Sequence, residues 1–138
     1  MHAVLDTNVL VSALKSKRGA SFEVLKEVSA GRIRLAVTVP LLMEYESVLL
    51  RPGLIPKFTP SQIHSIIDNL ASIAWHQEVY YLWRPWLTDP KDEMVLEAAL
   101  AARMNYIITH NLSDFTNARL AGVTAISPAQ AIQQINQP

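Results

Sequence analysis

The chain has 138 residues with twelve basic and twelve acidic side chains, so its net charge is zero and no global basic field would attract nucleic acid. The absence of cysteine excludes disulfides and thiolate metal sites, and the four histidines lack zinc-site spacing. Half of the residues are hydrophobic, which indicates one globular domain over residues 1–138. No apolar run is long enough to cross a membrane, and Asp6 comes too early for a signal peptide, so we expect a cytoplasmic protein.

Short apolar segments, which predict strands, alternate with amphipathic segments, which predict helices. In chain order we expect a strand at 3–5, helices at 8–15 and 21–30, a strand at 34–39, helices at 40–50 and 60–74, a strand at 78–82, a helix at 90–104, strands at 106–109 and 123–126, and a helix from 128. This alternation predicts an α/β fold in which helices cover both faces of a central parallel sheet, a three-layer α/β/α sandwich.

Polar side chains follow two of the predicted strands. Asp6 ends the apolar run of the first strand, and Thr109 ends the strand at 106–109. Ligands of such folds bind in the crevice beyond the carboxyl ends of the strands. Because a bare buried carboxylate is costly, we expect Asp6 to face that crevice.

The helix predicted at 40–50 carries two glutamates on opposite sides of its apolar stripe. Glu44 and Glu46 each lie about 100° from the centre of that stripe. Periodicity leaves open which of them is functional, and both also suit an ordinary solvated boundary.

Acidic residues also cluster at the start of the helix at 90–104. Asp89 followed by Pro90 is typical of an N-cap and first helical residue. Asp92 shares a face with the apolar residues three, four and seven positions later, whereas Glu93 and Glu97 are expected to be solvated. Favourable placement near the helix N-terminus accounts for an acid in the first turn but not for an acid on the apolar face.

Four acids from separate segments are therefore the candidates for a site: Asp6, Glu44, Asp92 and Asp114. A turn in which Asn111 or Asp114 acts as a cap is the structural alternative for the last of these. If the carboxylates converge, their repulsion must be relieved by protons or cations. Oxygen ligands without cysteine or paired histidines suit Mg²⁺ or Mn²⁺, which promote water attack on phosphodiesters.

At these residues the sequence resembles the PIN-domain family, and within it the VapC-like toxin ribonucleases of toxin–antitoxin pairs. The similarity covers nearly the whole chain through "VLDTNVLVSAL", "VPLLMEYESVLLRP", "DPKDEMVLEAALAARMNYIITHN" and "DF" followed by "GVTAISPAQAI". The resemblance implies an α/β/α nuclease domain and a Mg²⁺- or Mn²⁺-dependent endoribonuclease that leaves a 5′-phosphate and a 3′-hydroxyl. It also implies a homodimer and a neutralising antitoxin partner.

The resemblance places the family's first aspartate on Asp6, supported by Thr7 and Asn8, its glutamate on Glu44 and its helix-opening aspartate on Asp92. Asp6 and Asp92 would then bind the cation, directly or through water. Glu44 would orient the attacking water or join the metal shell.

The fourth acid departs from the family pattern. Many members have an aspartate two residues after the threonine that matches Thr109, and here that position is the neutral Asn111. Asp114 lies three residues further on and is the candidate substitute, so Asp114 or Asn111 would complete the outer part of the site, with Thr109 in a supporting role. With Asn111 alone, the site would have one ligand charge fewer and hold its metal more weakly.

Substrate contacts are indicated only weakly. Lys15, Lys17 and Arg18 follow the first predicted helix and suit RNA phosphates, although a solvated turn explains them equally well. The aromatic segment at 80–86 suits base stacking or, more commonly, core and interface packing.

Two other functions remain open at this point. Haloacid-dehalogenase-like phosphatases also begin with an aspartate after the first strand, but they need a second acid where this chain has Asn8. A catalytically degenerate module that only binds RNA or protein is suggested by Asn111.

Overall fold

The computed structural model describes residues 1–78, 87 and 89–137 of the chain. In this part of the chain, five parallel strands form one sheet in the order β3-β2-β1-β4-β5. The strands are β1 (His2–Leu5), β2 (Arg34–Val37), β3 (Trp75–His76), β4 (Tyr106–Ile108) and β5 (Thr124–Ile126). All of their carboxyl ends therefore lie along the same edge of the sheet.

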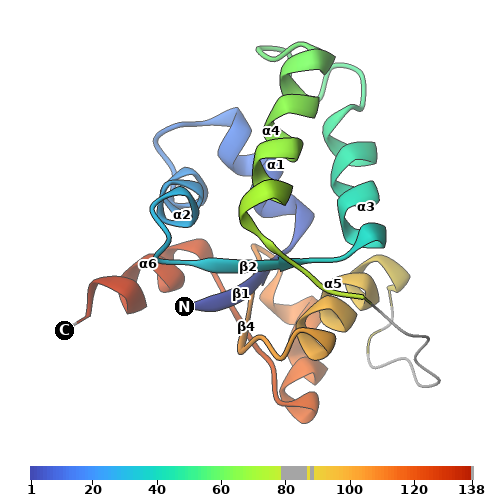
Figure 1. Ribbon diagram of the computed structural model, residues 1–138. Coiled ribbons are helices and arrows are strands. Elements are labelled where there is room, and N and C mark those ends of the chain that lie inside the picture. The colour runs from blue at the N-terminus through green and yellow to red at the C-terminus, as the bar shows by residue number, and fades with distance from the viewer. Residues whose placement is uncertain (79–86, 88, 138) are drawn as a thin grey trace.

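Helices cover both faces of this sheet, as Figure 1 shows. The first face carries α1 (Thr7–Lys15), α2 (Ala20–Ser29), α3 (Val39–Leu49) and α4 (Pro60–Ile73). The other face carries α5 (Pro90–Ala101) and the 3₁₀ segment η1 (Leu112–Ala121), and α6 (Pro128–Asn136) packs against α2. None of the helices in the described ranges is both long and apolar enough to span a bilayer.

The direction of the connections creates a crevice beside β1. The chain moves from β1 through β2 to β3 on one side, and then continues through β4 to β5 on the other side. The adjacent ends of β1 and β4 are therefore the switch point at which α/β sheets open a ligand crevice. The Asp6 amide donates to the carbonyl of Ile108 over 3.0 Å, which fixes the first residue beyond β1 against the end of β4.

The predicted fold class is confirmed, and most predicted elements appear within a few residues of their expected bounds. The strand expected at 34–39 ends at Val37, because Thr38 instead caps α3 by accepting the Leu41 amide over 3.2 Å. Helix α4 buries Ile63, Ile67 and Leu70, which lie on one face at helical spacing and turn that face to the core.

Of the strand expected at 78–82, residues 79–82 lie outside the described residues, and Glu78 lies outside any strand. The edge strand of the described sheet is Trp75–His76, which the sequence pattern did not predict. Both residues of β3 are exposed, because pairing with β2 uses only main-chain groups and an edge strand needs no apolar alternation. The aromatic segment at 80–86 also lies outside the described residues.

The segment after β4 forms η1 with Asn111 at its N-cap position, and the fully buried Phe115 and Ala118 anchor it. The expectation that Glu93 and Glu97 are solvated was wrong. Glu93 is buried rather than solvated, and it accepts a hydrogen bond from the Leu87 amide. Helix α5 packs between the sheet and η1, so it has apolar contacts on more than one side. Glu97 is half-buried, and burial together with Glu93 raises its pKa.

Tyr45 ties helix α3 to the strand that carries Asp6. Its side chain is fully buried, and its hydroxyl donates to the carbonyl of Leu5 over 2.5 Å. Burial and the nearby Asp6 charge raise the pKa of Tyr45 well above its usual value, so the phenol stays neutral and keeps its proton for this bond.

Tyr45→Phe is expected to lower the free energy of unfolding by about 1–3 kcal/mol, because it removes the donor to a buried carbonyl while keeping the ring. Urea denaturation measures this loss. Tyr106→Phe is the matched control, since within the described ranges the Tyr106 hydroxyl forms no hydrogen bond. An equal loss in both variants would show that the Tyr45 hydroxyl contributes nothing specific.

Candidate functional site

A network of hydrogen bonds fixes Asp6 at the ends of β1 and β4. Asp6 is 8% exposed, and its Oδ2 accepts from the Thr109 hydroxyl over 2.8 Å and from the Asn8 side-chain amide over 3.1 Å. Asn8 Oδ1 in turn accepts the His110 amide over 3.2 Å, and Thr109 Oγ1 accepts the Asn111 amide over 3.0 Å. The expected supporting residues Asn8 and Thr109 are therefore both in contact with Asp6.

The surroundings of Asp6 oppose its charge. Burial raises the pKa of Asp6 above its ordinary value, and the charge of Asp114 adds to this effect. Hydrogen bonds from Thr109, from the Thr7 backbone and from Asn8 act in the opposite direction. Asn8 helps to hold Asp6 and the chain after β4 through its neutral amide, which does not supply the second acid that the phosphatase alternative needs.

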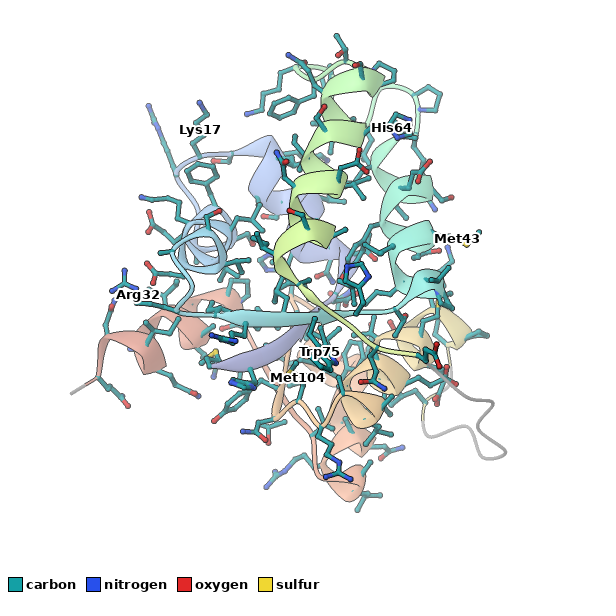
Figure 2. The ribbon with its side chains drawn as sticks, viewed as in Figure 1. Lys17, Arg32, Met43, His64, Trp75 and Met104 are labelled. Atoms are coloured by element: carbon teal, nitrogen blue, oxygen red, sulfur yellow. The ribbon has the colours of Figure 1, made fainter. Side chains whose placement is uncertain are left out.

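A cavity of about 670 Å³ brings most of the predicted site residues together. The predicted residues that line it are Asp6, Thr7, Asn8, Lys15, Glu44, Asp92, Asn111 and Asp114. Three of the predicted residues do not line it. Thr109 is buried behind Asp6, while Lys17 and Arg18 are exposed in the turn between α1 and α2, where Lys17 points outward (Figure 2).

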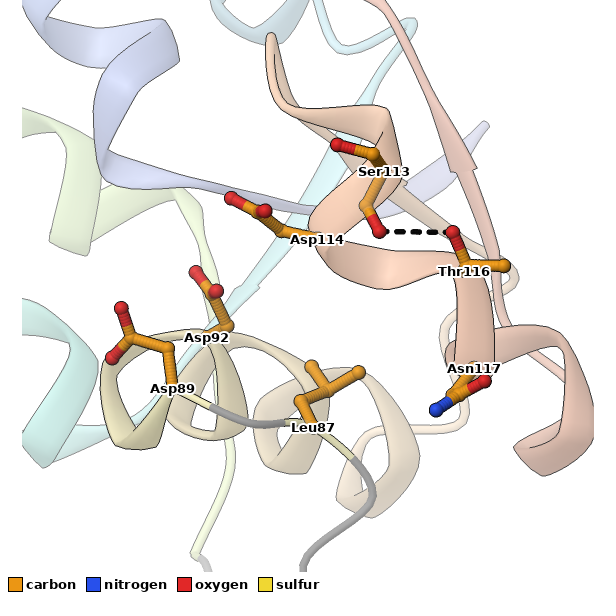
Figure 3. Close-up of a pocket in the computed structure, with 7 residues that line it drawn as sticks. All are labelled: Leu87, Asp89, Asp92, Ser113, Asp114, Thr116 and Asn117. Atoms are coloured by element: carbon orange, nitrogen blue, oxygen red, sulfur yellow. Dashed lines mark hydrogen bonds between the residues drawn. The ribbon is translucent and has the colours of Figure 1, made fainter.

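The acidic part of this cavity continues into a smaller one of about 250 Å³. Asp89 and Asp92 come from the start of α5, and Asp114 comes from η1 on the facing side (Figure 3). Burial and the charges of Asp6, Asp89, Asp114 and Glu93 raise the pKa of Asp92 to about 6. The carboxylates from β1, α5 and η1 are thus close enough to repel one another.

The structure also shows which of the two glutamates of α3 faces the cavity, a choice that helical periodicity left open. Glu44 lines the cavity, its side chain is 16% exposed, and the Lys91 ammonium lies 3.8 Å from its Oε1. Glu46 points to the outer side of α3, where its side chain is 49% exposed and lies 3.8 Å from His64.

The chemistry of this donor set fits a hard divalent cation. Carboxylate oxygens dominate it, and their raised pKa values reflect a local excess of negative charge that a dication would offset. As they stand, no three acidic or histidine side chains of the described residues are grouped closely enough to hold an ion together. The residues therefore fit an ion such as Mg²⁺ that keeps several waters and is held by one or two carboxylates.

Asp92→Asn is expected to stabilise the protein at neutral and alkaline pH. The raised pKa means that the folded state binds the Asp92 proton more tightly than the unfolded state does. The stability that this protonation contributes is complete below pH 3.8 and is lost as the pH rises to about 6, so the ionised Asp92 destabilises the wild-type protein at higher pH and asparagine does not. Because Asp92 is partly exposed and solvent screens the repulsion, we expect about 1 kcal/mol at pH 8.

Thermal melts at pH 4 and pH 8 check this dependence. The gain should be present at pH 8 and absent at pH 4. Asp68→Asn, on an exposed position of α4, should shift neither melt. A gain of equal size at both pH values would contradict an electrostatic cause.

Several residues of the site were not anticipated from the sequence. Arg51 and Lys91 line the large cavity, and Asp89 lines both cavities while capping α5 by accepting the Lys91 amide over 2.9 Å. The Ser21 hydroxyl lies 2.7 Å from His110 Nε2, which joins α2 to the segment after β4. The spacing of Glu44, Val48 and Arg51 at intervals of four and three was the available indication that Arg51 shares the Glu44 face.

Comparison with known proteins supports the fold. The structure of VapBC2 from Rickettsia felis bound to a promoter DNA fragment contains a similar chain with a TM-score of 0.63 and 16% identity, covering 92% of this chain and 98% of that one. A chain of FitAB bound to a DNA fragment has a TM-score of 0.63 and 18% identity, covering 91% and 94%.

A domain from Methanocaldococcus jannaschii, of unknown function, has a TM-score of 0.53 and 14% identity, covering 91% of this chain and 89% of that one. No curated protein matches the sequence. A family model described as the PIN domain matches residues 2–113, which is most of the chain. The chain therefore belongs to the PIN-domain family.

Proposed function

We propose that the chain, as one nuclease domain, is a Mg²⁺- or Mn²⁺-dependent endoribonuclease and the toxin of a toxin–antitoxin pair. The observation that carries this proposal is the meeting of acids from β1, α3, α5 and η1 in one cavity at the switch point of the sheet. Membership of the PIN-domain family supports it.

The acidic side chains of the cavity have different roles in the proposed hydrolysis. Asp6, held by Thr109 and Asn8, and Asp92 would hold the divalent cation. A cation bound there supplies activation of water and stabilisation of charge on the phosphodiester. Glu44, which lines the same cavity from α3, orients the attacking water. The water oxygen bonds to phosphorus as the bond to the 3′-oxygen breaks, which leaves a 5′-phosphate and a 3′-hydroxyl.

Asp114 is the better candidate for the fourth acid. Its charge raises the pKa values of both Asp6 and Asp92, and it lines both cavities. Asn111 lines only the larger cavity, and its amide supports Thr109. We therefore assign Asp114 to the outer part of the metal site and Asn111 to a supporting role.

The expected protein partners are an antitoxin and a second copy of the chain. The similar VapBC2 and FitAB chains come from structures bound to DNA fragments. By analogy we propose a neutralising antitoxin, together with the homodimer that is usual in the family.

Cleavage of an end-labelled single-stranded RNA tests the proposal. We expect products with 5′-phosphate ends in Mn²⁺ or Mg²⁺, no products in EDTA, and no cleavage of duplex DNA. Metal-independent cleavage would contradict the proposal.

The neutral residue at Asn111 favours one alternative, a degenerate module that binds RNA or protein without cutting. RNA that is retained by the protein but stays intact in every divalent metal would support that alternative over the nuclease.

A further inference from the structure

The large cavity extends beyond its acidic end as a groove between α1 and α3. Its outer half is lined by Val11 and Lys15 from α1, by Val48 from α3, and by Arg51 and Leu54 from the segment after α3. We call these five residues the α1–α3 groove. It is continuous with the acidic centre, because all five line the same cavity as Asp6 and Glu44.

The two helices turn matching faces towards this groove. On α1, Thr7, Val11 and Lys15 are spaced four residues apart, so they lie on one face that runs from the acidic centre outwards. The helical rise places Lys15 about 12 Å beyond Thr7 along α1, and Arg51 lies two residues past the end of α3 at Leu49. Both walls of the groove therefore end in a cation.

The cations of the groove are available to a ligand. Within the described residues, the exposed Lys15 and Arg51 side chains form no ion pair, whereas Lys91, nearer the acidic centre, pairs with Glu44. Val11, Val48 and Leu54 are half-buried and give the groove an apolar wall. Two unpaired cations beside an apolar wall suit a ligand that carries negative charge and a flat apolar surface together.

We infer that the α1–α3 groove binds the nucleotide next to the scissile phosphate of single-stranded RNA. Lys15 and Arg51 contact the flanking phosphate, and the apolar wall contacts the base. This inference rests on the proposed function, because the acidic end of the same cavity would hold the reacting phosphate through its cation. A paired strand keeps its bases stacked inside the duplex, so only unpaired RNA can reach the apolar wall.

Equilibrium binding tests the groove separately from catalysis. The measurement uses fluorescence anisotropy of a labelled single-stranded RNA with the Glu44→Gln protein, which lacks the group proposed to orient the attacking water but keeps the proposed cation ligands Asp6 and Asp92, in Mn²⁺ and at several salt concentrations. Adding Arg51→Gln should weaken binding about tenfold and lower the slope of log K against log salt by about 0.7, the share of one contact to a single strand. Lys26→Gln, whose lysine pairs with Glu23 on α2, should change binding less than about twofold and leave the slope unchanged.

Neutral methylphosphonate linkages, placed one at a time along the RNA, locate the contact. Arg51→Gln should weaken binding of the fully charged RNA. When the one linkage that Arg51 contacts, beside the cleavage position, is already neutral, Arg51→Gln should weaken binding no further. An equal loss at every linkage, or an effect no larger than that of Lys26→Gln, would overturn the inference. The inference would equally fail if Arg51→Gln weakened binding of a polyglutamate peptide and not of RNA, because the groove would then belong to a protein partner.

The outcomes distinguish the groove from the nuclease activity. If the wild-type protein cleaves RNA in a metal-dependent way and Arg51→Gln leaves RNA binding unchanged, the inference about the groove is wrong and the nuclease proposal stands. If Arg51→Gln weakens RNA binding at one linkage and the wild-type protein does not cleave RNA, the inference about the groove stands and the nuclease proposal is wrong. Failure of the Glu44→Gln protein to bind RNA at all overturns the inference about the groove, and the wild-type cleavage assay then decides the activity by itself.

Discussion

Replacing Asp6 with asparagine is expected to lower RNA cleavage by more than about a hundredfold without unfolding the protein. Residues that merely support metal ligands typically contribute 10–100-fold, so loss of a proposed ligand should exceed that range. The asparagine oxygen can still accept the hydrogen bonds from Thr109 and Asn8, so the local geometry is kept. Because burial already raises the pKa of Asp6, a neutral side chain there should not lower the melting temperature.

Initial cleavage rates in Mn²⁺ and thermal melts of the same preparations measure both parts of this prediction. Glu46→Gln is the control, because Glu46 lies on the outer side of α3 and does not line the cavity. Its rate should stay within about twofold of wild type. If Asp6→Asn cleaved RNA as fast as Glu46→Gln, Asp6 would have no part in the reaction.

Thr109→Val is expected to lower cleavage by about 10–100-fold although Thr109 does not line the cavity. Valine keeps the branched shape but removes the donor to Asp6 and the acceptor for the Asn111 amide. Since the Thr109 hydrogen bond lowers the pKa of Asp6, its loss raises that pKa further. The acidic limb of the pH–rate profile should therefore move to higher pH, and part of the activity should return at alkaline pH.

Thr109→Ser separates the hydrogen bond from general packing. Serine keeps the hydroxyl, so its pH–rate profile should match that of wild type even if its stability falls because of the lost methyl group. A Thr109→Val variant whose activity is reduced equally at all pH values would show a packing defect and not an effect on Asp6.

The sequence was sufficient for the layer order of the fold. Unbroken apolar runs such as Ile107–Ile108 require burial on both faces, and together with intervening amphipathic helices this allows little except a covered parallel sheet. The edge strand Trp75–His76 was not predicted, because its pairing is a main-chain property and its two exposed residues carry no apolar pattern that would mark them as a strand.

The acids of the candidate site could also be predicted from the local sequence pattern. Asp6 ends a buried strand, and Asp92 stands on an apolar helix face, so each conflicts with its own local pattern. The cations were harder to identify, because exposed residues such as Arg51 and Lys91 look ordinary until α1, α3 and α5 are packed together. Glu93 was misjudged because α5 is buried on more than one side, which removes the single polar face that periodicity assumes.

We propose that acids distant in sequence form one site for a hard dication. An anomalous-difference map from a crystal soaked in Mn²⁺ is the sharpest test of this site. We expect a manganese peak in the cavity, in contact with the carboxylates of Asp6 or Asp92 or with waters bound to them, and its loss in the Asp6→Asn crystal. A cavity without manganese, or an ion that remains after this substitution, would show that these acids do not form a metal site.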